Sequence, residues 1–385
     1  MQPWLWLFWG GVAVTLFSYL GYPLVIAVLA HVIGRAPRMG DALPTVTLLI
    51  AAHNEESVIA AKLENSLAID YPAERLEILV VADGCVDGTC AIVEGFADRG
   101  VRLIRQEPRQ GKVSALNLAM PGAQGEIVVC TDANAMYRPD AIRKLVRHFA
   151  DPEVGLVAGQ KRILGEGGAA QGEGLYWRYE GFLKVMDSKV SSAMGATGEI
   201  FAIRKALWRS VPADTIIEDF VITMRLVMDG HRALYDPEAI SEEEASPSVG
   251  EEFKRKVRIV AGGWQAIVRL WPLLLPHHGV VTFQYVSHRV LRWIVVPLMQ
   301  PVMFLANAML ALHAPFYAAV FAVHAAFYAL ALAGYELQRR GHRPKLFYLP
   351  FYFAFLNGSA LLGAWRYFTR TQPVTWEKVK RSAAT

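Results

Sequence analysis

The chain has 385 residues, of which 54% are hydrophobic and 19% are charged, and its formal net charge is +4. So small a net charge argues against a general nucleic-acid-binding role, and the hydrophobic content is too high for an ordinary soluble protein. The three cysteines, Cys85, Cys90 and Cys130, lack the spacing of a metal site and fit a reducing compartment without disulfides.

Three long stretches without Lys, Arg, Asp or Glu divide the chain. They cover residues 1–34, 293–335 and 346–365. Because about 20 apolar residues span a bilayer, we expect one helix from the first stretch, two from the second with a turn near His313, and one from the third. The first stretch has no basic start and is too long for the apolar region of a signal peptide, which predicts a retained anchor.

The sequence therefore predicts five segments. They are a transmembrane helix (1–34), a cytosolic domain (41–246), an amphipathic interface helix (250–275), about three C-terminal transmembrane helices (289–368) and a basic tail (369–385). Basic residues adjoin the spans, among them Arg35 and Arg38 after the first. Since basic residues mark cytoplasmic flanks, we expect the 41–246 domain inside the cell.

Two segments leave alternatives open. From Glu251 to Trp271 basic residues interleave with apolar ones, which predicts a helix on the membrane surface, with an ordinary surface helix as the alternative. Three C-terminal spans would put the basic tail outside the cell, against the positive-inside tendency. A re-entrant hairpin at residues 357–359 would return the tail to the cytoplasm.

The 41–246 domain alternates apolar runs with amphipathic stretches, which predicts an α/β fold with a mostly parallel sheet and crossover helices. The expected strands cover residues 46–52, 77–81, 101–105, 126–129 and 154–158, and the expected helices run from 53–56 to 68, from 89 to 98, from 111 to 119 and from 139 to 149. Ligands bind beyond the carboxyl ends of such strands. Polar residues fall there, namely His53, Asn54, Glu55, Asp83, Asp132 and Asn134.

Asp132 and Asn134 follow the fourth expected strand. If the backbone stays extended, residues two apart point to the same side. A carboxylate and an amide oxygen are hard ligands, suited to Mg²⁺ or Mn²⁺ beside a phosphate. Asp and Asn are also common in turns that end strands, so a plain turn is the alternative.

Six motifs occur in one order between residues 44 and 271. They are AAHNEE, VVADGCVDGT, GKVSALN, TDAN, TGEIFAIRK and IIED. This order is similar to glycosyltransferase family 2, in the membrane-integrated branch that includes cellulose, chitin, hyaluronan and poly-N-acetylglucosamine synthases. The resemblance implies a GT-A nucleotide-sugar-binding domain between transmembrane helices of the bacterial inner membrane. It also implies a divalent metal, Mg²⁺ or Mn²⁺, and a sugar transfer that inverts the anomeric centre.

The resemblance also implies roles for residues at the donor. It places the nucleotide at Glu55 and Asp83, with His53 and Asn54 beside them, and the diphosphate at Lys112. A turn role for Asp83 and a plain exposed position for Lys112 are the alternatives. Asp132 and Asn134 would hold the metal. Because Asn134 replaces the second Asp of the family's Asp-x-Asp motif, metal affinity should depend more on Asp132 and the substrate phosphates, and Asn134→Asp should be tolerated.

For the reaction itself, the resemblance makes Asp219 the general base, with Glu218 beside it. The alternative is that two acidic residues simply favour the helix dipole. The acceptor would lie at residues 197–199, that is, Thr197, Gly198 and Glu199. The family's Gln-x-x-Arg-Trp capping motif is matched by residues 255–259, which keep an Arg but lose the Gln and the Trp. Arg255 and Arg258 are expected at the donor diphosphate.

The leading hypothesis is an enzyme that moves sugar from a UDP-sugar to a growing exopolysaccharide or glycan. Single transfer to a lipid or lipid-linked acceptor is one alternative, and a non-catalytic nucleotide-sugar-binding scaffold is another. The presence of Asp132 and Asp219 argues against the scaffold. The altered capping motif and the few spans predict weak processivity, so that export of a polymer would need a partner subunit or a second copy of the chain.

Overall fold

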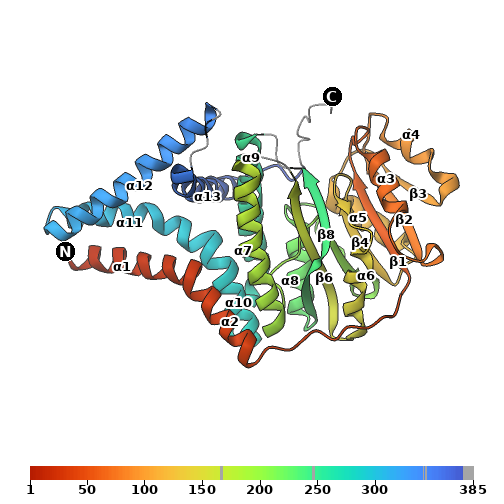
Figure 1. Ribbon diagram of the computed structural model, residues 1–385, viewed down its shortest axis with the longest axis horizontal. Helices are drawn as coiled ribbons and strands as arrows, with labels where there is room; N and C mark the ends of the chain where they lie inside the picture. The colour runs from red at the N-terminus through yellow and green to blue at the C-terminus, as the bar shows by residue number, and fades with distance from the viewer. Residues whose placement is uncertain (165–167, 245–247, 341, 343–344, 376–385) are drawn as a thin grey trace. The chain divides into compact units, whose positions relative to one another are not determined.

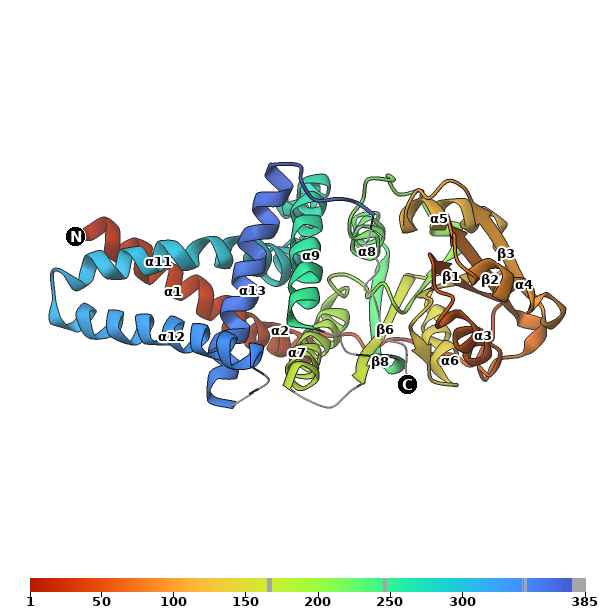
Figure 2. The ribbon, with the colours of Figure 1, turned by 90° about the horizontal axis from the view of Figure 1, so that it is seen from above.

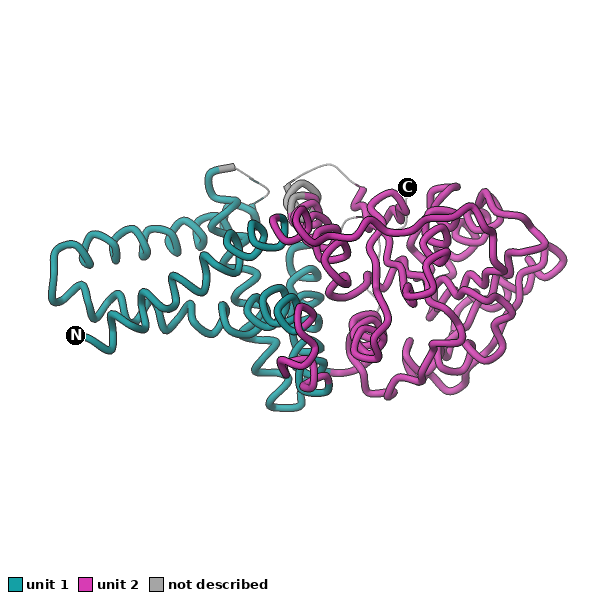
Figure 3. Tube along the Cα trace, turned by 90° about the horizontal axis from the view of Figure 1, so that it is seen from below, with its two compact units in different colours: residues 1–27, 248–269, 282–372 teal, residues 28–247, 270–281, 373–385 magenta. Residues whose placement is uncertain are grey.

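The computed structural model describes residues 1–164, 168–244, 248–340, 342 and 345–375. The chain divides into two compact units (Figure 3). The helical unit consists of residues 1–27, 248–269 and 282–372. The sheet unit consists of residues 28–247, 270–281 and 373–385.

The sheet unit contains an eight-stranded sheet with strand order β3-β2-β1-β4-β7-β6-β8-β5 (Figure 1). The strands are β1 (Val46–Ala52), β2 (Leu76–Asp83), β3 (Val101–Gln106), β4 (Ile127–Asp132), β5 (Met136–Tyr137), β6 (Val154–Leu164), β7 (Phe201–Arg204) and β8 (Arg232–Glu244). Strands β3, β2, β1 and β4 are parallel to one another. Strand β7 is antiparallel to its neighbours β4 and β6, and β6 is parallel to β8. The predicted α/β fold is confirmed, with a mixed rather than fully parallel second half.

The helices of this unit are α3 (Ile59–Leu67), α4 (Thr89–Glu94), α5 (Lys112–Ala119), α6 (Ala141–Val146), α7 (Gly168–Val190) and α8 (Glu218–Met228). Apolar side chains of β1, β2 and β4 form a core with those of α3 and α6, such as Ile50, Val80, Val129 and Leu63. Strand register places the ends of β1, β2 and β4 at one edge, because β1 residues 51 and 52 pair with residues 132 and 82. The polar residues that follow these strands therefore meet there.

Helix α3 begins at Ile59, later than the predicted start at residues 53–56. The backbone before it is tied to the loop after β2. Asn54 adopts a φ of 53°, the Glu55 N–H donates to Thr89 Oγ1 at 2.7 Å, and the Glu56 N–H donates to Asp87 Oδ2 at 3.2 Å. The positive φ of Asn54 is not helical, and the two bonds tie the Glu55 and Glu56 N–H groups to side chains of another segment, so the helix begins only after these residues.

The helical unit and its connections contain α1 (Gln2–Leu16), α2 (Tyr22–Val32), α9 (Val249–Arg269), α10 (Val280–Tyr285), α11 (Val296–Ala311), α12 (Pro315–Arg339) and α13 (Lys345–Phe368). Among the described residues, four helices are long and apolar enough to cross a membrane: 2–32, 280–311, 315–339 and 346–368. Short π-helical segments join α1 to α2 and α10 to α11. The break between α11 and α12 lies at the turn expected near His313.

Helix α13 packs along α9, and the two run in the same direction (Figure 2). Phe253 and Phe355 have ring centroids 5.3 Å apart, and Trp264 and Phe368 lie 4.9 Å apart at the other end. Between them, a β-carbon on Gly363 would lie only 2.8 Å from a backbone oxygen of α9, so the glycine permits this close approach. Helix α13 is continuous through residues 357–359, and the re-entrant hairpin considered for them is wrong.

Residues 369–372 of the tail belong to the helical unit, and residues 373–375 belong to the sheet unit. Thr375 Cγ2 lies 3.6 Å from the position that a β-carbon would take on Gly111, in the loop before α5. Residues 376–385 of the predicted basic tail lie outside the described residues.

Candidate active site

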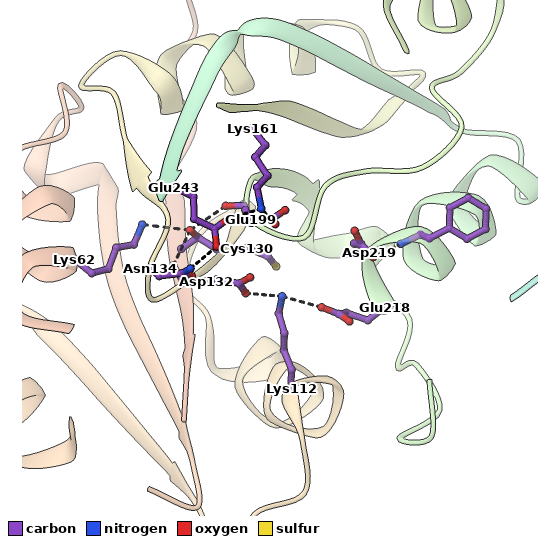
Figure 4. Close-up of polar contacts among 12 residues, drawn as sticks. Lys62, Lys112, Cys130, Asp132, Asn134, Lys161, Glu199, Glu218, Asp219 and Glu243 are labelled. Carbon is purple, nitrogen blue, oxygen red and sulfur yellow. Dashed lines mark hydrogen bonds and ion pairs between the residues drawn. The ribbon is translucent and has the colours of Figure 1, made fainter. Parts of the chain in front are cut away.

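Lys112 links two elements at the edge of the sheet. Its Nζ lies 2.6 Å from Oδ1 of Asp132, the last residue of β4, and 2.8 Å from Oε1 of Glu218, the first residue of α8 (Figure 4). Although burial opposes it, the two carboxylates hold the pKa of Lys112 well above its usual range. The side chains of Lys112 and Asp132 remain 29% and 32% exposed, so a ligand can reach the pair.

Gly198 lies next to both Lys112 and Asp219. A β-carbon on Gly198 would be 3.4 Å from Lys112 Nζ and 3.5 Å from Asp219 Oδ2, so these two groups are at most about 7 Å apart. Burial and repulsion by Glu218 raise the pKa of Asp219 to about 7, against the attraction of Lys112. The structure thus places the Lys112 ammonium and the Asp219 carboxyl group, whose pKa is about 7, next to Gly198, which has no side chain.

A second lysine, Lys161, bridges two further carboxylates beside Asn134. Lys161 Nζ lies 2.5 Å from Glu199 Oε1 and also pairs with Glu243. Glu243 Oε1 in turn accepts a hydrogen bond of 2.5 Å from Asn134 Nδ2. Glu243 therefore fixes the orientation of the Asn134 amide and leaves its carbonyl oxygen on the opposite side.

The loop that carries Asn134 turns away from the strand, because β4 ends at Asp132 and a turn follows. The backbone does not stay extended past Asp132, as the turn alternative had it, and the two side chains contact different partners. Lys62 lies beneath this loop and donates to Thr131 Oγ1 at 3.2 Å and to the Ala135 carbonyl. Burial lowers the pKa of Lys62 to about 7.

Asp83 holds the loop that leads to Lys112. Its carboxylate accepts hydrogen bonds of 2.7 Å from Gln106 Nε2 and from the N–H groups of Gln110 and Gly111. The adjacent Gly84 has a φ of 57°, and a β-carbon on it would lie 2.6 Å from the Arg109 nitrogen, so only glycine fits. Asp83 thus organises the site, and its direct contact with a nucleotide stays a prediction.

The other residues predicted at the nucleotide of the sugar donor lie at the same edge of the sheet. His53 Nδ1 lies 2.5 Å from the Asp83 carbonyl oxygen, and Asn54 Oδ1 accepts from the Val86 N–H at 2.8 Å. The backbone of Glu55 is fixed by Thr89, as described above. These bonds join the end of β1 to the loop after β2, which gives the three residues a structural role beside their predicted nucleotide contact.

Three further predicted residues lie in the turn before Gly198 and in α9. Thr197 Oγ1 donates to the Gly159 carbonyl at 3.0 Å, which fixes the turn before Gly198. Arg255 and Arg258 belong to α9 in the helical unit, where Arg255 Nε lies 2.7 Å from Glu252 Oε2. The predicted contact of Thr197 with the acceptor sugar and the predicted contacts of the two arginines with the sugar-donor diphosphate stay predictions.

The sequence does not single out Lys62, Lys161 or Glu243. The acidic run at residues 242–244 was the available signal for Glu243, but an acidic run far from the other motifs usually lies in solvent. In the close-up, five carboxylates gather with three lysines. They are Asp132, Glu199, Glu218, Asp219 and Glu243, with Lys62, Lys112 and Lys161. The excess of carboxylates favours a cation ligand.

The contact with Glu243 changes the expectation for Asn134→Asp. A carboxylate at residue 134 would face Glu243 at hydrogen-bond distance without a proton to share, so we now expect lower activity, not tolerance. The double variant Asn134→Asp with Glu243→Gln restores a donor and an acceptor, and should recover activity. Steady-state rates of the single and double variants test this. Full activity of Asn134→Asp alone would contradict it.

Comparison with known proteins agrees with this geometry. The sequence profile described as glycosyltransferase like family 2 matches residues 44–262. A beta-monoglucosyldiacylglycerol synthase of Trichormus variabilis is 29% identical over 288 residues, covering 69% of this chain and 59% of that protein. A poly-beta-1,6-N-acetyl-D-glucosamine synthase of Staphylococcus epidermidis is 26% identical over 241 residues, covering 60% of this chain and 57% of that protein.

The chain thus spans less than two thirds of the length of these two relatives. Among solved structures, a mannosyltransferase of Pyrobaculum calidifontis in complex with GDP-Man and Mn²⁺ has a TM-score of 0.72 at 25% identity. That similarity covers 94% of this chain and 99% of the other. The profile match extends over more than half of the residues, and the chain belongs to glycosyltransferase family 2.

Proposed function

We propose that this protein transfers a sugar from a nucleoside-diphosphate sugar to an acceptor held at a membrane. The observation that carries the proposal is the arrangement around Gly198, where Lys112 and Asp219 both approach within about 3.5 Å of an added β-carbon. Displacement at a sugar carbon needs a cation at the leaving phosphate and a base at the attacking hydroxyl. Lys112 suits the first task, and Asp219 suits the second.

In the proposed reaction, Asp219 takes the proton of the acceptor hydroxyl as its oxygen attacks the anomeric carbon. The bond from that carbon to the diphosphate breaks as the new glycosidic bond forms, and the electron pair leaves with the nucleoside diphosphate. One displacement inverts the anomeric centre. A carboxyl group whose pKa is about 7 suits a general base, because it is ionised at the working pH and still basic enough to accept a proton.

The residues present fit a divalent metal ion. Asp132 offers a carboxylate that is about one third exposed, and Glu243 orients the Asn134 amide so that its oxygen is free of that hydrogen bond. Oxygen ligands of this kind suit Mn²⁺ or Mg²⁺, with phosphate oxygens and water completing the coordination. When bound, the metal would neutralise the charge that develops on the diphosphate leaving group.

The nucleotide of the donor needs a direct test. The sequence favours a UDP-sugar, whereas the Pyrobaculum calidifontis structure contains GDP-Man. We expect purified full-length enzyme in lipid nanodiscs to release nucleoside diphosphate from one class of a UDP-sugar and GDP-sugar panel, with Asp219→Asn as the inactive control. Mass spectrometry of the lipid and glycan products would name the acceptor. Release from none of the donors would contradict the proposed function.

The packing of α13 supports a second candidate, which is addition of one or a few sugars to a lipid or lipid-linked acceptor. Helix α9 carries a run of charged residues over 251–258 that cannot enter hydrocarbon. Since α13 packs along α9 over most of its length, we infer that α13 also lies at the interface and does not span the bilayer. The three remaining candidate spans leave few helices to enclose a polymer path within one chain.

We expect the tail to lie on the cytoplasmic side with the sheet unit. Thr375 lies beside Gly111, in the loop before Lys112 within that unit, and a cytoplasmic tail also agrees with its basic residues. In intact spheroplasts, a membrane-impermeant maleimide should leave Ser382→Cys unlabelled until the membrane is permeabilised. Ala314→Cys, in the turn between α11 and α12, should be labelled at once and serves as the control. Outside labelling of Ser382→Cys would mean that α13 crosses the membrane.

A further inference from the structure

Lys112 occupies a cation position on Asp132 in this structure. Its ammonium lies 2.6 Å from Asp132 Oδ1, and Glu218 Oε1 holds the same ammonium at 2.8 Å (Figure 4). Asp132 is the charged member of the proposed metal pair. A divalent ion that binds Asp132 must therefore compete with Lys112 for the carboxylate.

The carboxylates near Asp132 do not form a ready-made metal site. Among the described residues, no group of three or more His, Cys, Asp and Glu side chains is placed to hold a metal ion. Asn134 contributes an oxygen without a formal charge. Mg²⁺ and Mn²⁺ sites of this kind take most of their ligands from water and from substrate phosphates, so the bare ion has little with which to displace an ammonium.

The charges change when a diphosphate arrives. Without the diphosphate, a divalent ion beside Lys112 places two cations next to Asp132 and Glu218. The two cations repel each other at close range. A diphosphate bound here supplies new oxygen acceptors that the Lys112 ammonium can reach. The metal can then take the Asp132 carboxylate, and both cations have an anionic partner.

We propose that Lys112 is a resident counter-ion that keeps the metal off Asp132 until the donor diphosphate draws the ammonium away. This inference rests on the donor site proposed above and adds an order of binding to it. Metal and nucleotide then bind together, and each strengthens the other by the same factor, because coupling between two ligands is reciprocal. The metal concentration that the enzyme needs should accordingly fall as the donor concentration rises.

The test is a Mn²⁺ titration of full-length protein, followed by the electron paramagnetic resonance signal of free Mn²⁺, with no nucleotide, with UDP and with GDP. For the wild type, one nucleotide should raise the Mn²⁺ affinity by roughly 5- to 150-fold, the usual size of such coupling. Lys112→Gln should bind Mn²⁺ alone about tenfold or more tightly than the wild type, and should gain less from nucleotide. Lys112→Arg keeps the charge and should behave like the wild type.

Lys161→Gln is the matched control, because it removes the same charge from a lysine that bridges two other carboxylates, those of Glu199 and Glu243. It should change Mn²⁺ affinity far less than Lys112→Gln. Melting curves of each variant show whether it is folded.

Three outcomes would overturn the inference. Equal Mn²⁺ affinity of Lys112→Gln and the wild type would overturn it while leaving the donor site intact. An equal gain in Mn²⁺ affinity in Lys161→Gln would show that the effect comes from net charge alone, and would also overturn the inference. If no variant binds Mn²⁺ even with nucleotide, the proposed metal site fails together with the inference.

Discussion

Replacing Asp219 by Asn is expected to lower turnover by about 10²- to 10⁴-fold, the usual contribution of a general base, while donor binding stays near the wild-type value. The amide has almost the same shape, and its oxygen can still accept the 2.8 Å hydrogen bond from the Phe220 N–H. It cannot take a proton from the acceptor hydroxyl. Nucleotide binding by calorimetry and single-turnover rates separate the two effects.

The pH dependence of the wild type gives an independent check. Because the proposed base works only when ionised and its pKa is about 7, the rate should rise with pH through neutrality and level off above it. The residual activity of Asp219→Asn should lack this rise. Near-native turnover in the variant would show that Asp219 is only a structural residue in the first turn of α8 and that the general base lies elsewhere.

Stability supplies the control for misfolding in this variant. The folded pKa of Asp219 is raised from 3.8 to about 7, so ionising it costs free energy in the folded state at every pH above the unfolded value. That cost grows between about pH 4 and pH 7 and is then constant, and an asparagine does not carry it. Asp219→Asn should therefore melt no lower than the wild type at about pH 7.5, and the difference should vanish below about pH 4.

The parts of the fold that follow local rules could be predicted from the sequence. The apolar runs at β1, β2 and β4 are bounded by polar residues, and their period and length predict buried parallel strands. Strands β7 and β8 could not be found in this way. Strand β7 has four residues, and β8 contains Pro237 and shifts register against β6 after Gly159.

The site shows the same division between local and long-range information. Asp132, Lys112 and Asp219 stand at the ends of predicted elements, so motif order and strand register bring them together. Glu243 meets Asn134 across 109 positions of the sequence, through a strand that the sequence does not predict. Such a contact depends on sheet order, which a single sequence does not contain, and it reverses the expected effect of Asn134→Asp.

Replacing Asp132 by Ala is expected to abolish sugar transfer, because it removes the one carboxylate of the proposed metal pair. The structure adds a second reason, since Lys112 loses the partner that holds it at the site and keeps only Glu218. Excess Mn²⁺ should not restore activity, because Asn134 alone provides no charged ligand. Asp140→Ala, which removes a surface carboxylate paired with Lys144 at 2.7 Å, is the control and should retain activity.

Chelation tests the same conclusion without a mutation. EDTA should stop the wild-type reaction, and added Mn²⁺ or Mg²⁺ should restore it, because without the metal the developing charge on the leaving diphosphate meets basic side chains alone. The folded state should be unaffected by EDTA, since Lys112 then returns to Asp132 and Glu218 and neutralises part of their charge. Full turnover in EDTA, or measurable transfer by Asp132→Ala, would show that the basic side chains suffice and that Asp132 serves only to position Lys112.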